Sequence, residues 1–117
     1  MSFDDELADR IRRALARRRD VTEKKMFGGL AFLRDGRMFC GVVADSLMVR
    51  VGPEQYDEVL AEPHVRPMDF TGRPMKGYVF VGPAGCARDQ DVAQWVRRGV
   101  RVVSKLDSAP QRRSRKR

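Results

Sequence analysis

The dipeptide Asp35-Gly36 separates two runs rich in apolar residues, and it constrains the fold more than any other feature of the chain. Both central positions of a tight two-residue hairpin favour positive φ, and Asp-Gly is one of the preferred pairs there. The turn predicts two antiparallel strands in which Arg34 lies opposite Arg37. A second tight turn at Asp45-Ser46 extends the hairpin into a meander of three strands.

Side chains alternate across a strand, so this register sorts the meander into two faces. One face is entirely apolar and is predicted to be the core face: Ala31, Leu33, Met38, Cys40, Val42, Ala44, Leu47, Val49 and Val51. The other face mixes large apolar groups with three arginines: Leu30, Phe32, Arg34, Arg37, Phe39, Gly41, Val43, Met48 and Arg50.

This mixed composition is typical of interface cores, which favour aromatic residues, Met and Arg. The mixed face is therefore either a surface that binds a protein partner or a face half covered by the chain's own loops. In the first case, the expected partner-binding residues are Phe32, Arg34, Arg37, Phe39, Met48 and Arg50.

The remaining elements follow from local patterns. Apolar residues at helical spacing predict a first helix from about residue 3 to residue 17. Pro53 begins a short helix, residues 78–81 form a strand, and Asp89 caps a long helix in which Gly99 indicates a close approach to the sheet. The order of helix, three strands, short helix, one or two strands and long helix predicts an α+β fold, with one apolar sheet face under the helices.

Basic residues are concentrated at the C-terminal end of the sequence. The chain has 24 Lys plus Arg against 16 Asp plus Glu, and the stretch from Asp107 onward contains no large apolar residue. We therefore expect a folded domain over residues 1–106 and a disordered basic tail over residues 107–117. The tail is a candidate for non-specific binding to nucleic-acid phosphates through Arg112, Arg113, Arg115, Lys116 and Arg117.

The sequence offers little for catalysis. His64 is the only imidazole, and with Cys40 and Cys86 it cannot complete a four-ligand zinc site without carboxylates. Cys86 precedes the last predicted helix, whose dipole could lower the pKa of its thiol. We expect no enzyme activity, no metal and no cofactor. The chain lacks an apolar run of the ~18 to 20 residues that span a bilayer, and its first residues are acidic, so we expect a cytoplasmic protein away from membranes.

Several residues form a pattern that spans most of the chain. They are Lys25-Met26-Phe27-Gly28-Gly29, Phe32, Asp35-Gly36 and Met38-Phe39, followed by Phe70, Gly72, Pro74-Met75 and Gly77-Tyr78. This pattern resembles the N-terminal domain of the TfoX/Sxy competence regulators. The resemblance implies an α-β(3)-α-β(2)-α fold and an association with transcriptional control of DNA uptake, in which full-length regulators act as co-activators. Those regulators carry a second, helical domain where this sequence continues into its basic tail.

Two function classes therefore remain open. The leading hypothesis is a non-enzymatic protein-interaction module of the TfoX type that binds a protein partner or forms a homodimer. The alternative is a nucleic-acid-binding protein that acts through the basic tail and the helix arginines. Salt dependence distinguishes the two, because phosphate contacts weaken steeply with salt and apolar interfaces respond little.

Overall fold

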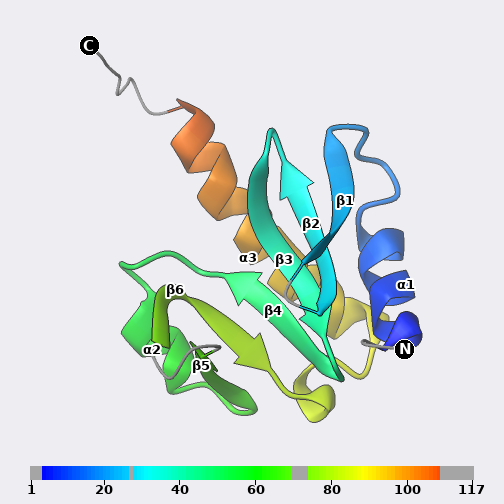
Figure 1. Cartoon of the computed structure of the whole chain (residues 1–117). Helices are drawn as coiled ribbons and strands as arrows, with labels where there is room; N and C mark the ends of the chain where they lie inside the picture. Colours follow the sequence, from blue (N-terminus) through cyan, green and yellow to red (C-terminus); the bar gives the residue numbers. More distant parts are fainter. Residues whose placement is uncertain (1–3, 27, 70–73, 109–117) are drawn as a thin grey trace.

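Six strands form one antiparallel sheet in the order β1-β2-β3-β4-β6-β5, and the α-helices pack on one of its faces (Figure 1). The computed structural model describes residues 4–26, 28–69 and 74–108. In chain order the elements are α1 (Asp5–Ala14), β1 (Val21–Met26), β2 (Gly29–Arg34), β3 (Arg37–Val43), β4 (Ser46–Arg50), α2 (Tyr56–Leu60), β5 (Val65–Asp69), β6 (Pro74–Val81), the short 3-10 helix η1 (Pro83–Gly85) and α3 (Asp89–Ser108). The predicted α+β class, with helices on one face, is confirmed.

Strand β1 is an addition to the predicted order, so four strands rather than three precede α2. Its sequence, VTEKKM, lacks apolar alternation, and Thr22 to Lys25 are exposed. The strand pairs only with β2 and forms one edge of the sheet. Charged side chains on an edge strand discourage pairing with other chains, which is a reason for a polar strand at this place.

The turn between β2 and β3 lies at Asp35-Gly36 as predicted. Both residues have positive φ, 53° for Asp35 and 78° for Gly36, and Arg34 lies opposite Arg37. Two residues further on the pairing slips, because Phe32 lies opposite Cys40 and leaves Phe39 as an extra residue in β3. This β-bulge places Phe39 and Cys40 on the same side of the sheet.

The bulge divides the two faces differently from the prediction. The helix face, which packs against the helices, contains Leu30, Phe32, Phe39, Cys40, Val42, Leu47, Val49, Val51, Val79 and Val81. The core prediction was therefore right for Cys40 and every predicted core residue after it except Ala44, which lies in a turn. Ala31, Leu33 and Met38 lie on the opposite face, because the extra residue inverts β2 and the start of β3 relative to the rest, although Ala31 is itself buried.

The second turn lies at Ala44-Asp45 rather than at Asp45-Ser46. Val43 pairs with Ser46, and Ala44 takes a positive φ of 52°. Cys40 consequently lies opposite Val49 instead of Val51. A shift of two residues keeps each side chain on its face, so this error in register leaves the face assignment of β4 unchanged.

The helices that cover the sheet begin and end at identifiable signals. Helix α1 is capped by Asp4, whose carboxylate accepts hydrogen bonds from the amides of Glu6 and Leu7, and it ends at Ala14, earlier than predicted. Asp89, the predicted cap of helix α3, is its first residue, and the helix continues to Ser108, two residues into the predicted tail. The other nine residues of the predicted tail, 109–117, lie outside the described residues.

Helix α3 approaches the sheet closely at Gly99, as predicted. A Cβ atom on Gly99 would lie 2.4 Å from the backbone oxygen of Phe39. Its buried neighbours Val92, Trp95, Val96, Val100 and Val103 fill the layer between α3, α1 and the helix face. No helix in the described ranges is long and apolar enough to cross a membrane.

Candidate partner-binding site

The six residues expected to bind a partner do not share one face of the sheet. Phe32 and Phe39 are 1% and 0% exposed and lie in the core beneath the helices. The bulge at Phe39 is the reason, because it directs both aromatic rings to the helix face. These two side chains are therefore not available to a partner in the folded protein, which corrects the expectation for them.

Arg34 and Arg37 lie on either side of the Asp35-Gly36 turn, at the end of β2 and the start of β3. Arg34 reaches toward the helix side, where its Nε donates to Asp20 Oδ2 at 2.7 Å and its Nη1 lies 3.5 Å from Ser104 Oγ of α3. Arg37 lies opposite Arg34 and is exposed. The structure thus separates these two arginines from Met48 and Arg50, the remaining members of the predicted set.

Met48 lies at the centre of a second apolar cluster, on the sheet face away from the helices. Met48, Met68 and Phe80 are buried there, and Met38, Val43 and Tyr78 pack around them half-buried. Figure 1 views the sheet from this side, with α3 passing behind it. By the strand register the described side chains of this second face are Thr22, Lys24, Met26, Ala31, Leu33, Met38, Val43, Ser46, Met48, Arg50, Arg66, Met68, Tyr78 and Phe80.

A glycine on the neighbouring strand makes room for Met48. Gly41 lies opposite Met48, and a Cβ atom on Gly41 would be 2.9 Å from Met48 Cε and 2.6 Å from the backbone oxygen of Leu30. The absence of a side chain lets the thioether lie across β3. Methionine adapts its shape to a partner more readily than branched residues do, which suits a contact surface.

Two arginines lie over the aromatic rings of the second face. The guanidinium carbon of Arg50 is 5.5 Å from the centre of the Tyr78 ring, and that of Arg66 is 4.8 Å from the centre of the Phe80 ring. Arg66 also donates from Nη1 to Ser46 Oγ at 3.3 Å. Stacking on a ring orients each cation and buries its aliphatic stem.

All charged side chains that the structure describes on the second face are basic. Lys24, Arg50 and Arg66 are its charged members, and none of its described side chains is a carboxylate. Sequence reasoning missed Arg66, Met68, Tyr78 and Phe80. The alternation of Tyr78 and Phe80 with Val79 and Val81 was a signal that the aromatic rings and the valines face opposite ways.

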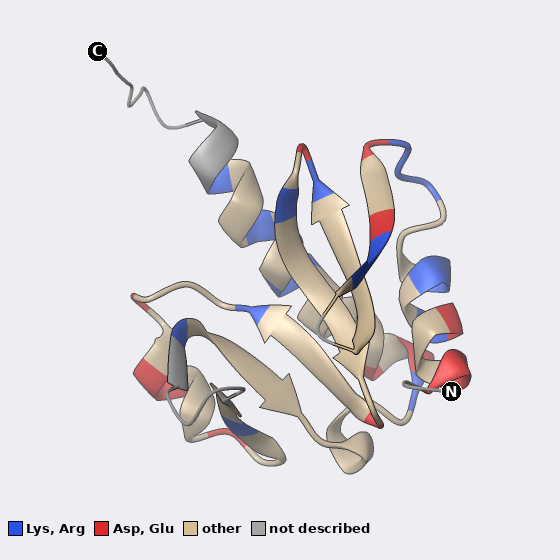
Figure 2. Ribbon diagram, in the orientation of Figure 1, with Lys and Arg blue, Asp and Glu red and all other residues tan. Residues whose placement is uncertain are grey.

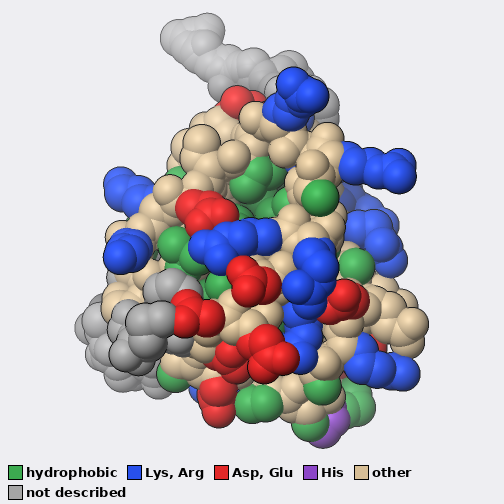
Figure 3. All heavy atoms as spheres, turned by 90° about the vertical axis from the view of Figure 1, so that its right-hand side faces the viewer, with side chains coloured by type: hydrophobic (Ala, Val, Ile, Leu, Met, Phe, Trp, Pro, Cys, Tyr) green, Lys and Arg blue, Asp and Glu red, His purple; other side chains and the backbone are tan. Residues whose placement is uncertain are grey.

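The arginines of the helices, in contrast, are mostly paired with carboxylates of the same chain. Arg12 binds Glu23 through two hydrogen bonds of 2.9 and 2.8 Å, and Arg98 of α3 binds Glu62 at 2.9 Å. Figure 2 shows Lys and Arg spread over helices, strands and loops. On the side that carries α1 and β1, basic and acidic side chains lie beside one another (Figure 3). The expected nucleic-acid residues Arg112, Arg113, Arg115, Lys116 and Arg117 lie outside the described residues.

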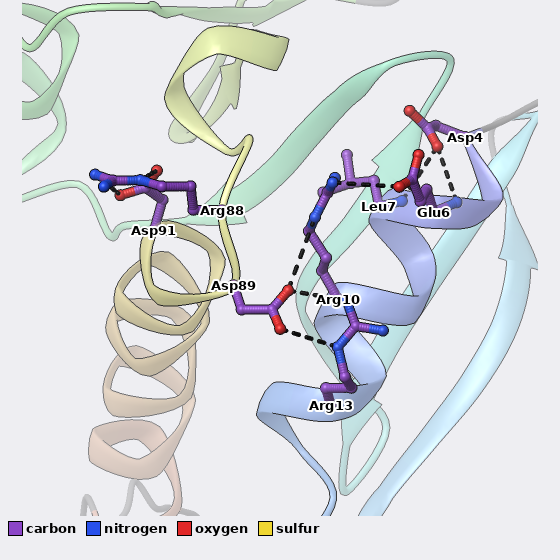
Figure 4. A network of polar contacts seen from close by, with 8 residues as sticks. All are labelled: Asp4, Glu6, Leu7, Arg10, Arg13, Arg88, Asp89 and Asp91. Carbon is purple, nitrogen blue, oxygen red and sulfur yellow. Dashed lines mark hydrogen bonds and ion pairs between the residues drawn. The ribbon is translucent and has the colours of Figure 1, made fainter.

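Asp89 joins α3 to α1 through two arginines (Figure 4). Arg13 donates from Nη2 to Asp89 Oδ1 at 2.8 Å and from Nε to Oδ2 at 3.1 Å, and Arg10 Nε lies 3.8 Å from Oδ1. The hydrogen bond from Arg13, helped by the positive charge of both arginines, holds the pKa of the Asp89 carboxyl below its ordinary value of 3.8. This pair fixes the first turn of α3 against α1.

Replacing Asp89 by asparagine is expected to destabilise the fold modestly at neutral pH and to make no difference in strong acid. Because the pKa of Asp89 is lowered in the folded state, the carboxylate contributes stability above the unfolded pKa, and this contribution is lost as the pH falls through the folded pKa. Thermal denaturation of both proteins from about pH 7 to about pH 2 measures the effect. Asp57→Asn, at an exposed position of α2, is the control, and an Asp89→Asn difference that persists unchanged in acid would contradict the assignment.

Both thiols are buried. Burial raises the pKa of Cys86, which corrects the expectation of a lowered value, and its Sγ donates to the carbonyl oxygen of Gly82 at 3.3 Å. Burial likewise raises the pKa of Cys40, which is 0% exposed in the core. Among residues 4–26, 28–69 and 74–108 there is no group of three His, Cys, Asp or Glu side chains that could hold a metal ion.

Comparison with known proteins agrees with the pattern in the sequence. A family model described as the TfoX N-terminal domain matches residues 13–103. The match begins within α1, includes all six strands and extends into α3. A search of curated proteins and a search of solved structures gave no match.

Proposed function

Since the chain belongs to the TfoX N-terminal domain family, we propose that it is a non-enzymatic protein-interaction module that serves transcriptional control of the kind associated with competence regulators. In this proposal it acts by contact with another protein, as a co-activator does, and the second face of the sheet is the contact surface. The proposal rests on one observation. A cluster of Met and aromatic side chains lies on the sheet face that the helices leave uncovered, with two arginines stacked on it.

The chemistry of the second face defines the partner. Half-buried Met38, Val43 and Tyr78 gain from contact with apolar side chains, because a partner would remove their remaining exposed area from water. Arg50 and Arg66 flank these residues without a described carboxylate on the same face. The partner surface is therefore an acidic one that also presents apolar anchors, such as an amphipathic segment rich in Asp or Glu.

This charge pattern disfavours a second copy docked face to face. Two copies would bring a face whose described charges, Lys24, Arg50 and Arg66, are all positive against another such face, and like charges across an interface reduce affinity. Nucleic acid is also disfavoured, because the second face offers an apolar centre to phosphates and the described helix arginines largely bind the chain's own carboxylates.

The proposal is tested with two synthetic amphipathic peptides that share the same Leu and Phe positions and carry either Glu or Lys elsewhere. Titration followed by two-dimensional amide NMR is expected to shift the amides of Met48, Phe80 and their strand neighbours with the Glu peptide only. The double variant Arg50→Glu with Arg66→Glu should weaken this binding about tenfold or more, since it reverses both charges at the contact.

The matched control is Lys25→Glu with Arg97→Glu, which changes the net charge equally at exposed positions outside the second face. It should retain most of the affinity. Thermal denaturation of both variants checks that they remain folded. Equal binding of both peptides, or equal loss in both double variants, would contradict the proposed site.

A further inference from the structure

We infer that a cavity between α3 and the loop after β4 is a binding site for a small organic anion with an apolar body. The cavity has a volume of about 250 Å³ and lies away from the second face. Its apolar lining comes from Val51, Pro53 and Val102, and its cations are Arg98, Arg101 and Lys105. This site goes beyond the proposed protein contact and does not depend on it.

The loop after β4 is fixed to β6 by hydrogen bonds of its backbone. The amides of Val51 and Gly52 both donate to the backbone oxygen of Gly77, at 2.7 and 3.0 Å. Gly52 adopts a φ of +85°, a left-handed conformation that suits glycine, and a Cβ atom there would be 3.7 Å from a methyl group of Val102. The backbone therefore approaches α3 at Gly52 and Val102, and the cavity opens between the loop and α3 beside this contact.

The three cations project from one side of α3. Arg98, Arg101 and Lys105 are separated by three and four residues, which is the spacing that brings helical side chains to the same face. Figure 2 shows basic positions along the part of α3 that leads toward its C-terminal end. Glu54 is the one carboxylate among the lining residues, and Arg98 binds Glu62 outside the lining.

One of these cations is held in a fixed position. Arg98 donates to Glu62 Oε2 at 2.9 Å, and its guanidinium carbon lies 4.4 Å from the centre of the Trp95 ring. These contacts orient the guanidinium before any ligand arrives, which reduces the entropy cost of binding. Arg101 is exposed and forms no ion pair within the described part of the chain, so it is available to an incoming anion.

The lining selects the class of ligand. An apolar wall with cations at one side fits a carboxylate attached to a short hydrocarbon or aromatic group. A polyphosphate fits less well, because it has no apolar group to contact the wall. The volume lies below the usual range of ligand pockets, roughly 300–1,000 Å³, so the ligand is small. A monocarboxylate of medium chain length meets both conditions.

Amide NMR titrations of the full chain with octanoate, octanol and inorganic phosphate test the inference. Octanoate is expected to shift Gly52, Gln55, Arg101 and Val102. Octanol should bind at least fivefold more weakly because it lacks the charge, and phosphate should produce no saturable shifts. Saturable phosphate binding as tight as octanoate binding, or octanoate shifts confined to other regions, would overturn the inference.

Variants separate the contributions of charge and space. Arg101→Gln with Lys105→Gln should weaken octanoate binding about tenfold, whereas Arg97→Gln, on the neighbouring exposed position outside the cavity, should change it less than twofold. Val102→Phe should abolish binding by filling the cavity without altering charge. Unchanged octanoate binding in Val102→Phe, with the fold verified by its amide spectrum, would also overturn the site.

Discussion

Replacing Phe32 by alanine is expected to lower the free energy of unfolding by about 3–5 kcal/mol, the range seen when a buried aromatic ring is removed. Phe32 is 1% exposed and belongs to the main core beneath the helices. The core around it contains side chains of α1 and of the sheet, and the loss is larger the less these surroundings collapse into the space that the ring leaves. Urea denaturation, with the slope compared between variant and parent, measures the change.

The adjacent residue provides the control for that experiment. Leu33 points to the second face and is only half-buried, so Leu33→Ala is expected to cost clearly less than Phe32→Ala. A hairpin without the bulge would bury Leu33 with Cys40 and Val42 and leave Phe32 on the other side. A greater loss for Leu33→Ala than for Phe32→Ala would therefore contradict the observed register.

The second large effect is expected at Gly99. Replacing a glycine inside a helix by alanine normally raises the free energy of unfolding, by up to about 1 kcal/mol, because alanine has the higher helix propensity. Here the added Cβ atom would lie 2.4 Å from the backbone oxygen of Phe39 and 3.4 Å from its Cβ atom, so α3 or β3 must shift. We expect Gly99→Ala to lower the free energy of unfolding by roughly 1–3 kcal/mol, the usual cost of overpacking.

A substitution on the exposed side of α3 isolates this effect. Gln94 is exposed, and Gln94→Ala is expected to leave the free energy of unfolding within about 0.5 kcal/mol of the parent. Both variants are compared by urea denaturation at one pH. A gain in stability for Gly99→Ala would show that the helix propensity of alanine dominates and that helix and sheet separate at little cost.

Much of the fold was predictable because its signals are local. The Asp35-Gly36 turn has both positive φ values that the dipeptide favours, and the long apolar stripe of α3 begins after Asp89 as expected. Gly99 also indicated the close approach that the structure shows. In each of these cases the conformation depends on a few neighbouring residues.

The division of the sheet into two faces was only half predictable. Residues on both sides of β2 and β3 are apolar, so hydrophobicity alone is consistent with a regular hairpin and with a bulged one. The choice depends on how Phe39 packs against α3, which is far away in the sequence. For the same reason four of the six expected partner residues were assigned to the wrong surface, while Met48 and Arg50 lie on the second face.

The edge strand β1 was missed for a different reason. Its residues Thr22 to Lys25 are exposed, and its position is determined by pairing with β2 rather than by burial. A polar segment with this role has no apolar period to detect. The residues of the second face on β5 and β6 were missed because the register between these strands depends on contacts distant in sequence.

The pairing of α1 with α3 has a consequence for the order of events during synthesis. Arg13 and Asp89 are 76 residues apart, and α3 follows every strand of the sheet. While a ribosome makes the chain, the valines of the helix face have no α3 to cover them until that helix has emerged. The sheet therefore cannot complete its core before α3 is made, and until then its apolar helix face is a natural client for chaperones that hold apolar surfaces.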